Sequence, residues 1–192
     1  MTRAELERTV ADDVRALAET QNPDGGWGYF SEMSSDRFVT TQVVQALVSR
    51  TVRGGRPAVL ENARTFLRNG VDATLRDLGQ RAALPVERRL AQPDDAARIV
   101  AAAAELSALA AAGTDVKARI GRLHAIATTL AVYPVEARAR LLALMAGKPA
   151  FAVARAELLR ALRAATHETA ATATVTTPYT RGERLLLASD VR

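Results

Sequence analysis

The chain has 192 residues, 48% of them hydrophobic and 4% aromatic, which favours a single all-α domain with a sizeable core over a β-sandwich or barrel. It contains no cysteine, and this excludes disulfides, thiolate catalysis and cysteine metal sites. The formal net charge is +5, but the basic residues are spread along the chain and matched by acidic ones, so we expect no nucleic-acid binding.

The first predicted element is a helix over about 4–21. Its apolar residues recur every three to four positions and form one stripe on a charged segment: Leu6, Val10, Val14 and Leu17. Thr2, followed three residues later by Glu5, predicts a capping box at the start of this helix. The charged start does not resemble a signal peptide, and no apolar run reaches the roughly 18 residues that a membrane span needs. We therefore expect no membrane contact by residues 1–192.

A tight glycine-rich turn is predicted to follow, and it contains the only tryptophan. Its residues form the candidate structural site: Gln21, Pro23, Asp24, Gly25, Gly26, Trp27 and Gly28. Pro23 ends the helix, and the glycines after Asp24 allow backbone angles that side chains disfavour. Because turn chemistry alone accounts for Asp24, we interpret Trp27 as a packing residue against the hairpin that the turn closes.

The remaining helices follow one another with short connections, so consecutive helices are expected to pack as antiparallel hairpins. They are predicted over about 36–52, 57–78, 93–112, 115–132, 134–146 and 149–166. Ser35 is the expected N-cap of the first of them, and Gly70 is a candidate break in the second. Pro93 is expected at the first position of the third, with Asp94 and Asp95 in its first turn.

The pattern changes near the C-terminus. Apolar residues alternate with threonine over 171–176, which is the two-residue period of a strand. A turn at 178–182 and a second strand at 183–188 complete a predicted β-hairpin over 171–188. Ser189 and Asp190 then resemble a helix cap with no helix behind it, so we interpret the chain as a fragment of a longer protein.

No group of residues in the sequence predicts catalysis, a cofactor or a metal. His124 and His167 are far apart and lack metal-ligand spacing. Asp94 and Asp95 resemble the acidic motif of terpenoid cyclases only faintly, and those enzymes need an aromatic-lined cavity that this chain cannot line. The serines after the turn do not combine with a base in a triad-like order: Ser31, Ser34 and Ser35.

Two segments resemble the thioester domain of bacterial alpha-2-macroglobulin-like proteins, an α/α toroid in which helical hairpins stack in a ring. The first runs from Gln21 to Leu47 and contains the glycine–tryptophan turn, and the second runs from Thr174 to Asp190. The stretch 133–144 between them is also similar to the family. The order of the two segments favours this family over the terpenoid cyclase and prenyltransferase toroids, which are similar to the first segment only.

The resemblance implies that residues 1–192 are part of one α/α-toroid domain, a partial ring, in a periplasmic or extracellular protein that traps proteases. In this family a Cys-x-Glu-Gln motif forms an internal thioester. The chain has no cysteine and cannot form that bond, so we expect it to be non-catalytic. The implied partners are neighbouring macroglobulin-like domains and captured proteases, and exposed helix faces are expected to self-associate. Two alternatives stay open, a partial toroid of a terpenoid cyclase or prenyltransferase-like enzyme and a generic helical interaction module.

Overall fold

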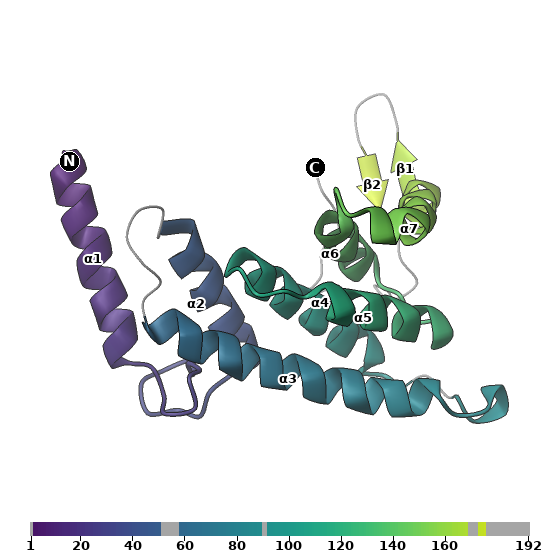
Figure 1. Ribbon diagram of the computed structural model, residues 1–192, viewed down its shortest axis with the longest axis horizontal. Coiled ribbons are helices and arrows are strands. Elements are labelled where there is room, and N and C mark those ends of the chain that lie inside the picture. The colour runs from purple at the N-terminus through teal and green to yellow at the C-terminus, as the bar shows by residue number, and fades with distance from the viewer. Residues whose placement is uncertain (1, 51–57, 90–91, 169–172, 176–192) are drawn as a thin grey trace. The chain divides into compact units, whose positions relative to one another are not determined.

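The computed structural model describes residues 2–50, 58–89, 92–168 and 173–175, and most of these residues are helical (Figure 1). Seven α-helices lie in this part of the chain: α1 (Arg3–Glu19), α2 (Arg37–Arg50), α3 (Ala58–Ala82), α4 (Asp95–Ala111), α5 (Lys117–Thr129), α6 (Val135–Met145) and α7 (Ala152–Ala165). Two short 3-10 helices, η1 (Val86–Arg88) and η2 (Pro149–Phe151), precede α4 and α7. The predicted all-α class is confirmed, and each helix begins and ends within a few residues of its predicted range.

The chain divides into two compact units. Unit 1 comprises residues 1–73 and 105–116, and unit 2 comprises residues 74–104 and 117–192. The first two of the three boundaries fall inside helices, so α3 and α4 each contribute residues to both units, and the third falls just before α5. The organisation as part of one toroid domain stays a prediction. Among the helices described, none combines the length and the apolar character that a bilayer crossing requires.

The core of unit 1 is formed by apolar side chains of the tryptophan turn, α2, α3 and α4. Its fully or almost fully buried members are Trp27, Val44, Leu47, Leu60, Ala63, Leu67, Val71, Leu106, Ala108, Leu109, Ala112 and Val116. Thr40 and Thr41 of α2 are also buried, and their hydroxyls donate to carbonyls one turn back in the helix, at 2.7 Å each. Burial of these hydroxyls therefore leaves no donor without a partner.

The starts of α1 and α2 confirm one expected cap and correct another. Thr2 and Glu5 form the predicted capping box, in which each side chain accepts from the backbone N–H of the other residue. Ser35 does not cap α2. Instead Asp36 accepts from the N–H of Val39 through Oδ1 at 2.9 Å, so Asp36 is the residue that satisfies the first turn.

Unit 2 is built largely from consecutive helices that contact each other. Helix α5 packs on α6, and α6 packs on α7. The buried apolar residues recur along one face of each helix: Leu75, Leu78, Ile99, Ala102, Ala103, Ile120, Leu123, Ile126, Ala127, Ala137, Leu141, Met145 and Leu158. The spacing of three to four residues is the one expected for amphipathic helices that share a core.

Two short strands follow α7. Strand β1 (Thr166–Glu168) pairs antiparallel with β2 (Ala173–Val175), with Thr166 opposite Val175. Strand β2 lies inside the first predicted strand, but its described partner is the segment directly after α7 rather than 183–188. The segment 183–188 lies outside the described residues, so the hairpin over 171–188 is not confirmed.

Candidate functional site

The connection between α1 and α2 is a loop closed by its own backbone hydrogen bonds (Figure 1). The N–H of Asn22 donates to the carbonyl of Gly26, and the N–H of Gly25 donates back to the carbonyl of Asn22, both at 2.9 Å. The N–H of Asp36 donates to the carbonyl of Trp27 at 2.8 Å. The beginning and the end of the loop are therefore fixed to each other.

Trp27 is the buried centre of this loop. Its side chain is 3% exposed, and its indole Nε1–H donates to the carbonyl of Leu17, near the end of α1, at 2.9 Å. Its backbone N–H donates to the hydroxyl of Thr40 in α2, also at 2.9 Å. Trp27 thus joins the end of α1 to α2, which is the packing role interpreted from the sequence.

Gln21 and Gly25 attach the same turn to α3. The side-chain amide of Gln21 donates to the carbonyls of Gly25 and Val59, each at 2.9 Å. Gly25 has a φ of +89°, and a Cβ at this position would lie 2.5 Å from the carbonyl oxygen of Asn62. Only glycine combines this backbone conformation with so close an approach.

The other residues of the predicted motif complete the turn. Asp24 accepts through Oδ1 from the N–H of Gly26 at 3.0 Å and from the hydroxyl of Ser35 at 2.6 Å. Pro23 is exposed beside it. Gly28 faces two carbonyls of the returning loop, and a Cβ there would lie 2.8 Å from each. Every polar atom in these contacts has a structural partner, so turn chemistry accounts for the motif.

Four exposed large apolar residues lie on the loop and at the start of α2, and we name them together the aromatic tip. Its members and their exposed fractions are Tyr29 (61%), Phe30 (75%), Met33 (47%) and Phe38 (64%). Two hydrogen bonds hold the backbone of the aromatic tip. The N–H of Met33 donates to the carbonyl of Phe30, and the side-chain amide of Asn22 donates to the carbonyl of Met33. Glu32, between Phe30 and Met33, has a φ of +70°, an energetically costly conformation that often occurs at binding sites. Sequence reasoning missed this cluster, although adjacent aromatic residues in a polar turn are a signal for it.

A buried ion pair is the second feature of unit 1 that the sequence analysis did not find. Arg37, the first residue of α2, places Nη2 2.5 Å from Oε2 of Glu105 in α4. The Glu105 side chain is 2% exposed, and this burial raises its pKa above the ordinary value, while the hydrogen bond and charge of Arg37 oppose the rise. The ionised form of Glu105 therefore depends on Arg37.

Gly70 lies where the Arg37 side chain passes α3. The expected break at Gly70 is wrong, since α3 continues through it from Ala58 to Ala82. A Cβ on Gly70 would lie 2.7 Å from Nε of Arg37 and 3.1 Å from its Cδ and Cζ. The glycine thus provides the space through which Arg37 reaches Glu105.

Gly70→Ala is expected to destabilise the protein by about 1 kcal/mol, although alanine normally stabilises a helix interior by about the same amount relative to glycine. The new methyl group would displace an Arg37 side chain whose end is fixed by Glu105. Gly79→Ala is the matched control, because it lies in the same helix and its nearest neighbour would be 3.4 Å away. Urea unfolding followed by far-UV circular dichroism compares the two variants. An equal increase in the free energy of unfolding of both variants would contradict the role assigned to Gly70.

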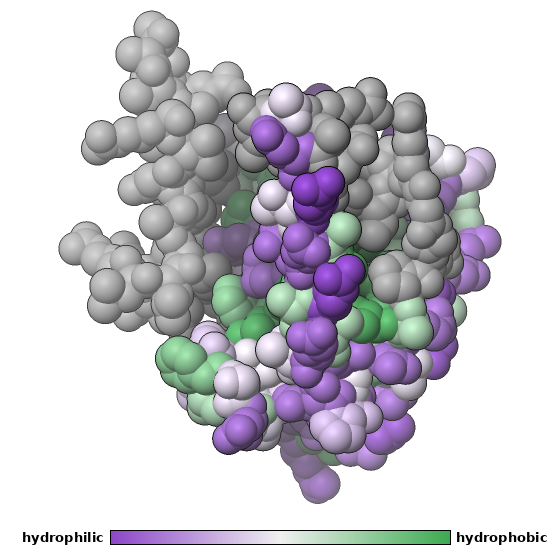
Figure 2. Space-filling model, turned by 90° about the vertical axis from the view of Figure 1, so that its left-hand side faces the viewer, coloured by the Kyte–Doolittle hydropathy of each residue, from purple (hydrophilic) through white to green (hydrophobic). Residues whose placement is uncertain are grey.

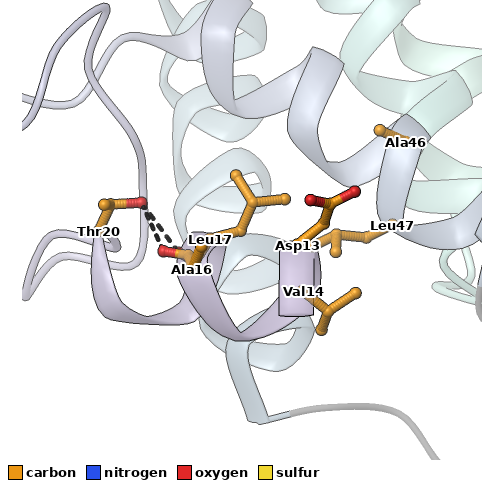
Figure 3. A pocket seen from close by; sticks show the side chains of 7 residues that line it. All are labelled: Asp13, Val14, Ala16, Leu17, Thr20, Ala46 and Leu47. Carbon is orange, nitrogen blue, oxygen red and sulfur yellow. Dashed lines mark hydrogen bonds between the residues drawn. The ribbon is translucent and has the colours of Figure 1, made fainter. Parts of the chain in front are cut away.

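An open groove lies between α1 and α2, with a volume of about 510 Å³. Figure 2 faces α1 and shows hydrophilic side chains in a column along the helix, with hydrophobic ones to either side. Figure 3 shows the groove-lining residues: Asp13, Val14, Ala16, Leu17 and Thr20 at α1, and Ala46 and Leu47 from α2. The groove is mainly apolar, and Asp13 is the charged residue in its wall.

In unit 2, the side chain of His124 has a specific partner, Tyr133. Its Nδ1 lies 3.0 Å from the hydroxyl of Tyr133, which is 7% exposed, and the guanidinium of Arg138 lies 5.3 Å from the centre of the Tyr133 ring. Burial raises the pKa of Tyr133, so its hydroxyl keeps its proton and can donate it to a neutral imidazole. Burial also lowers the pKa of His124, and Glu157 partly opposes this. The arrangement suits a neutral histidine in a structural hydrogen bond.

The lowered pKa of His124 predicts a loss of stability on acidification. The unfolded chain binds the proton near pH 6.5 and the folded protein only at lower pH, so the contribution is complete above 6.5 and lost as the pH falls below it. Thermal melts of the wild type and of His124→Gln between about pH 7 and about pH 5 measure this contribution. The wild type should lose more stability than the variant. Parallel pH profiles would contradict the prediction.

The acidic pair at the start of α4 is also structural. Asp95 is fully buried; its Oδ1 lies 2.5 Å from Nη2 of Arg81, and its Oδ2 accepts from the N–H of Gln92 at 2.8 Å. Asp94 is exposed, and α4 begins at Asp95, so Pro93 lies in the turn before the helix and not at its first position. The faint likeness to a cyclase motif therefore has no counterpart in the arrangement of these two carboxylates.

Other candidate residues do not converge on a reactive centre. Ser31 and Ser34 are exposed, and Ser35 binds Asp24 and Asn22. The side chain of His167 lies outside the described part of the structure. Within the described ranges, no three histidine or acidic side chains are placed so that they could bind a metal ion together.

Comparison with known proteins gives no relatives: no family model matches the chain, and neither a curated protein nor a solved structure matches it.

Proposed function

We propose that the chain is a non-catalytic part of the thioester domain of a bacterial alpha-2-macroglobulin-like protease-trapping inhibitor in the periplasm or outside the cell. The observation that carries the proposal is the tryptophan turn. The residues that resemble the family are the same residues whose burial and hydrogen bonds join α1, α2 and α3: Gln21, Gly25 and Trp27.

The finer architecture in this proposal is an α/α toroid, with the seven helices as part of its ring and residues 171–188 as a β-hairpin. Contacts between consecutive helices, α5 with α6 and α6 with α7, support a stack of helical hairpins. Since the chain has no cysteine, a thioester would be formed by another part of a longer protein. The contribution of this chain would then be structural, with the aromatic tip available for contact with a neighbouring macroglobulin-like domain.

A protease challenge of the complete gene product tests this function. A steric trap should block trypsin from a large protein substrate while trypsin still cleaves a small peptide. Unchanged cleavage of both substrates, or loss of both, would contradict a trap. Methylamine treatment of the same protein then separates two mechanisms, because a mass gain of one amine with release of one thiol marks a thioester, and no change marks the branch of the family without one.

The aromatic tip favours a second candidate, a helical interaction module with no role in protease trapping. Exposed clusters of large apolar side chains on soluble proteins commonly mark protein-binding surfaces. This candidate predicts that the protease challenge has no effect, while substitutions in the tip change an association that leaves the fold intact.

A further inference from the structure

Charge is distributed unevenly along this basic chain. Residues 16–36 contain four acidic residues and no lysine or arginine, although the whole chain has 26 basic and 21 acidic residues. Two of the four, Asp24 and Asp36, are engaged by the turn and by the cap of α2. Glu32 is exposed and lies between Phe30 and Met33 of the aromatic tip. The tip thus presents apolar side chains together with one negative charge.

The backbone of the tip is ordered before any partner binds. The bond from Asp36 to Trp27 closes the loop, and the amide of Asn22 binds the carbonyl of Met33 at 2.8 Å. Ordering a loop during association costs free energy, and a loop that is already ordered avoids this cost. Large aromatic side chains on such a loop have the properties of interface anchors.

A groove with complementary properties lies between α6 and α7 in unit 2. It is open to solvent, has a volume of about 570 Å³, and is lined by Ala139, Leu142, Ala143, Ala146, Ala152, Arg155, Ala156, Leu159 and Leu162. Five of these residues are alanines, so most of the wall carries small side chains. Arg155 is the only charged residue in this lining.

Charge distinguishes this groove from the one between α1 and α2. Asp13 is the charged residue of the α1–α2 groove, and it would repel Glu32. Arg155 of the α6–α7 groove would attract Glu32, while the alanine and leucine walls accept the apolar side chains. Complementary charge of this kind fixes the orientation of an interface.

We propose that the chain binds a second copy of itself head to tail, with the aromatic tip of one copy in the α6–α7 groove of the next. Phe30 and Tyr29 occupy the groove, and Glu32 lies opposite Arg155. The two surfaces are different, so each copy offers one free tip and one free groove. Such a contact propagates into longer assemblies unless it closes into a ring.

Complementary variants of the whole chain test the proposal by sedimentation velocity at increasing concentration. The tip variant is Tyr29→Ser with Phe30→Ser, and the groove variant is Ala143→Glu with Arg155→Glu, so that Glu32 of the altered tip is repelled by the altered groove. The substituted side chains lie on the surface or in the open groove, and far-UV circular dichroism checks that each variant keeps its helices. We expect the wild type to form assemblies and each variant alone to associate at least about tenfold more weakly.

The mixture of the two variants is the decisive sample. The tip variant still has an intact groove, and the groove variant still has an intact tip, so a 1:1 mixture should form dimers that do not grow further. Val86→Ser and Val153→Ser are controls, since these exposed residues lie outside both surfaces and their loss should change nothing. A wild type that stays monomeric, a variant that associates as the wild type does, or a mixture without dimers would each overturn the proposal.

Discussion

Trp27→Ala is expected to lower the free energy of unfolding by about 3–5 kcal/mol, the range for truncation of a large buried aromatic residue. The substitution removes a side chain that is 3% exposed, and with it the hydrogen bond from Nε1 to the carbonyl of Leu17. That carbonyl lies near the end of α1, where the last helical carbonyls have no partner within the helix. The carbonyl would keep the Thr20 hydroxyl, which donates to it at 3.2 Å, so the loss combines a cavity in the core of unit 1 with one hydrogen bond fewer at the end of α1.

Trp27→Phe is the matched control for this prediction. Phenylalanine keeps much of the buried volume but cannot donate a hydrogen bond, so its cost should be smaller, about 1–3 kcal/mol. Because Trp27 is the only tryptophan, its fluorescence is lost in both variants, and chemical unfolding must be followed by far-UV circular dichroism. A Trp27→Ala variant as stable as the wild type would show that the turn is not needed for the fold.

Arg37→Ala is expected to have the second large effect, a loss of about 3 kcal/mol near pH 7. Glu105 would remain with its carboxylate buried and its partner removed. The estimate is at the lower end for such pairs, because the Arg37 side chain is 36% exposed and water can enter where it has been cut back. Replacing both residues, with Arg37→Met and Glu105→Leu, should recover most of the loss, since no buried charge remains.

The pH dependence of Arg37→Ala gives an independent measurement. Burial raises the pKa of Glu105 above its ordinary value of 4.5, so the folded state binds this proton more tightly than the unfolded chain does. The penalty from the ionised carboxylate is therefore present at neutral pH and is relieved as the pH falls towards 4.5. We expect the stability gap between Arg37→Ala and the wild type to narrow over this range. A gap that widens would mean that Glu105 is not the cause of the loss.

The helices were predictable because their signals are local. The Thr2 and Glu5 pair lies within one turn of α1, and the apolar spacing of unit 2 repeats along each helix. The same local signals favour Ser35 as the cap of α2, whereas its neighbour Asp36 caps the helix in the structure. Ser35 is not the cap because its hydroxyl donates to Asp24, eleven positions earlier in the chain.

The ion pair beside the turn could not be predicted, because it joins residues that are 68 positions apart. Two signals were visible singly: Gly70 within a helical pattern, and Glu105 within an alanine-rich run. Nothing in the sequence connects Gly70 with Glu105. Their relation is visible only in the packed helices, where the Arg37 side chain passes Gly70 and reaches Glu105. The aromatic tip was missed for a different reason, since a turn pattern specifies the backbone and not which side chains remain exposed.

The attachment of the turn to α3 has a consequence for synthesis on the ribosome. Gln21 binds the carbonyl of Val59, and Gly25 lies against Asn62, so the turn is completed by residues translated after α2. A nascent chain that ends before Val59 would carry α1 and α2 without these anchors of the turn. We therefore expect the hairpin of α1 and α2 to become stable only once α3 has emerged from the ribosome. The N-terminal part of the chain would then fold only after α3 has been translated.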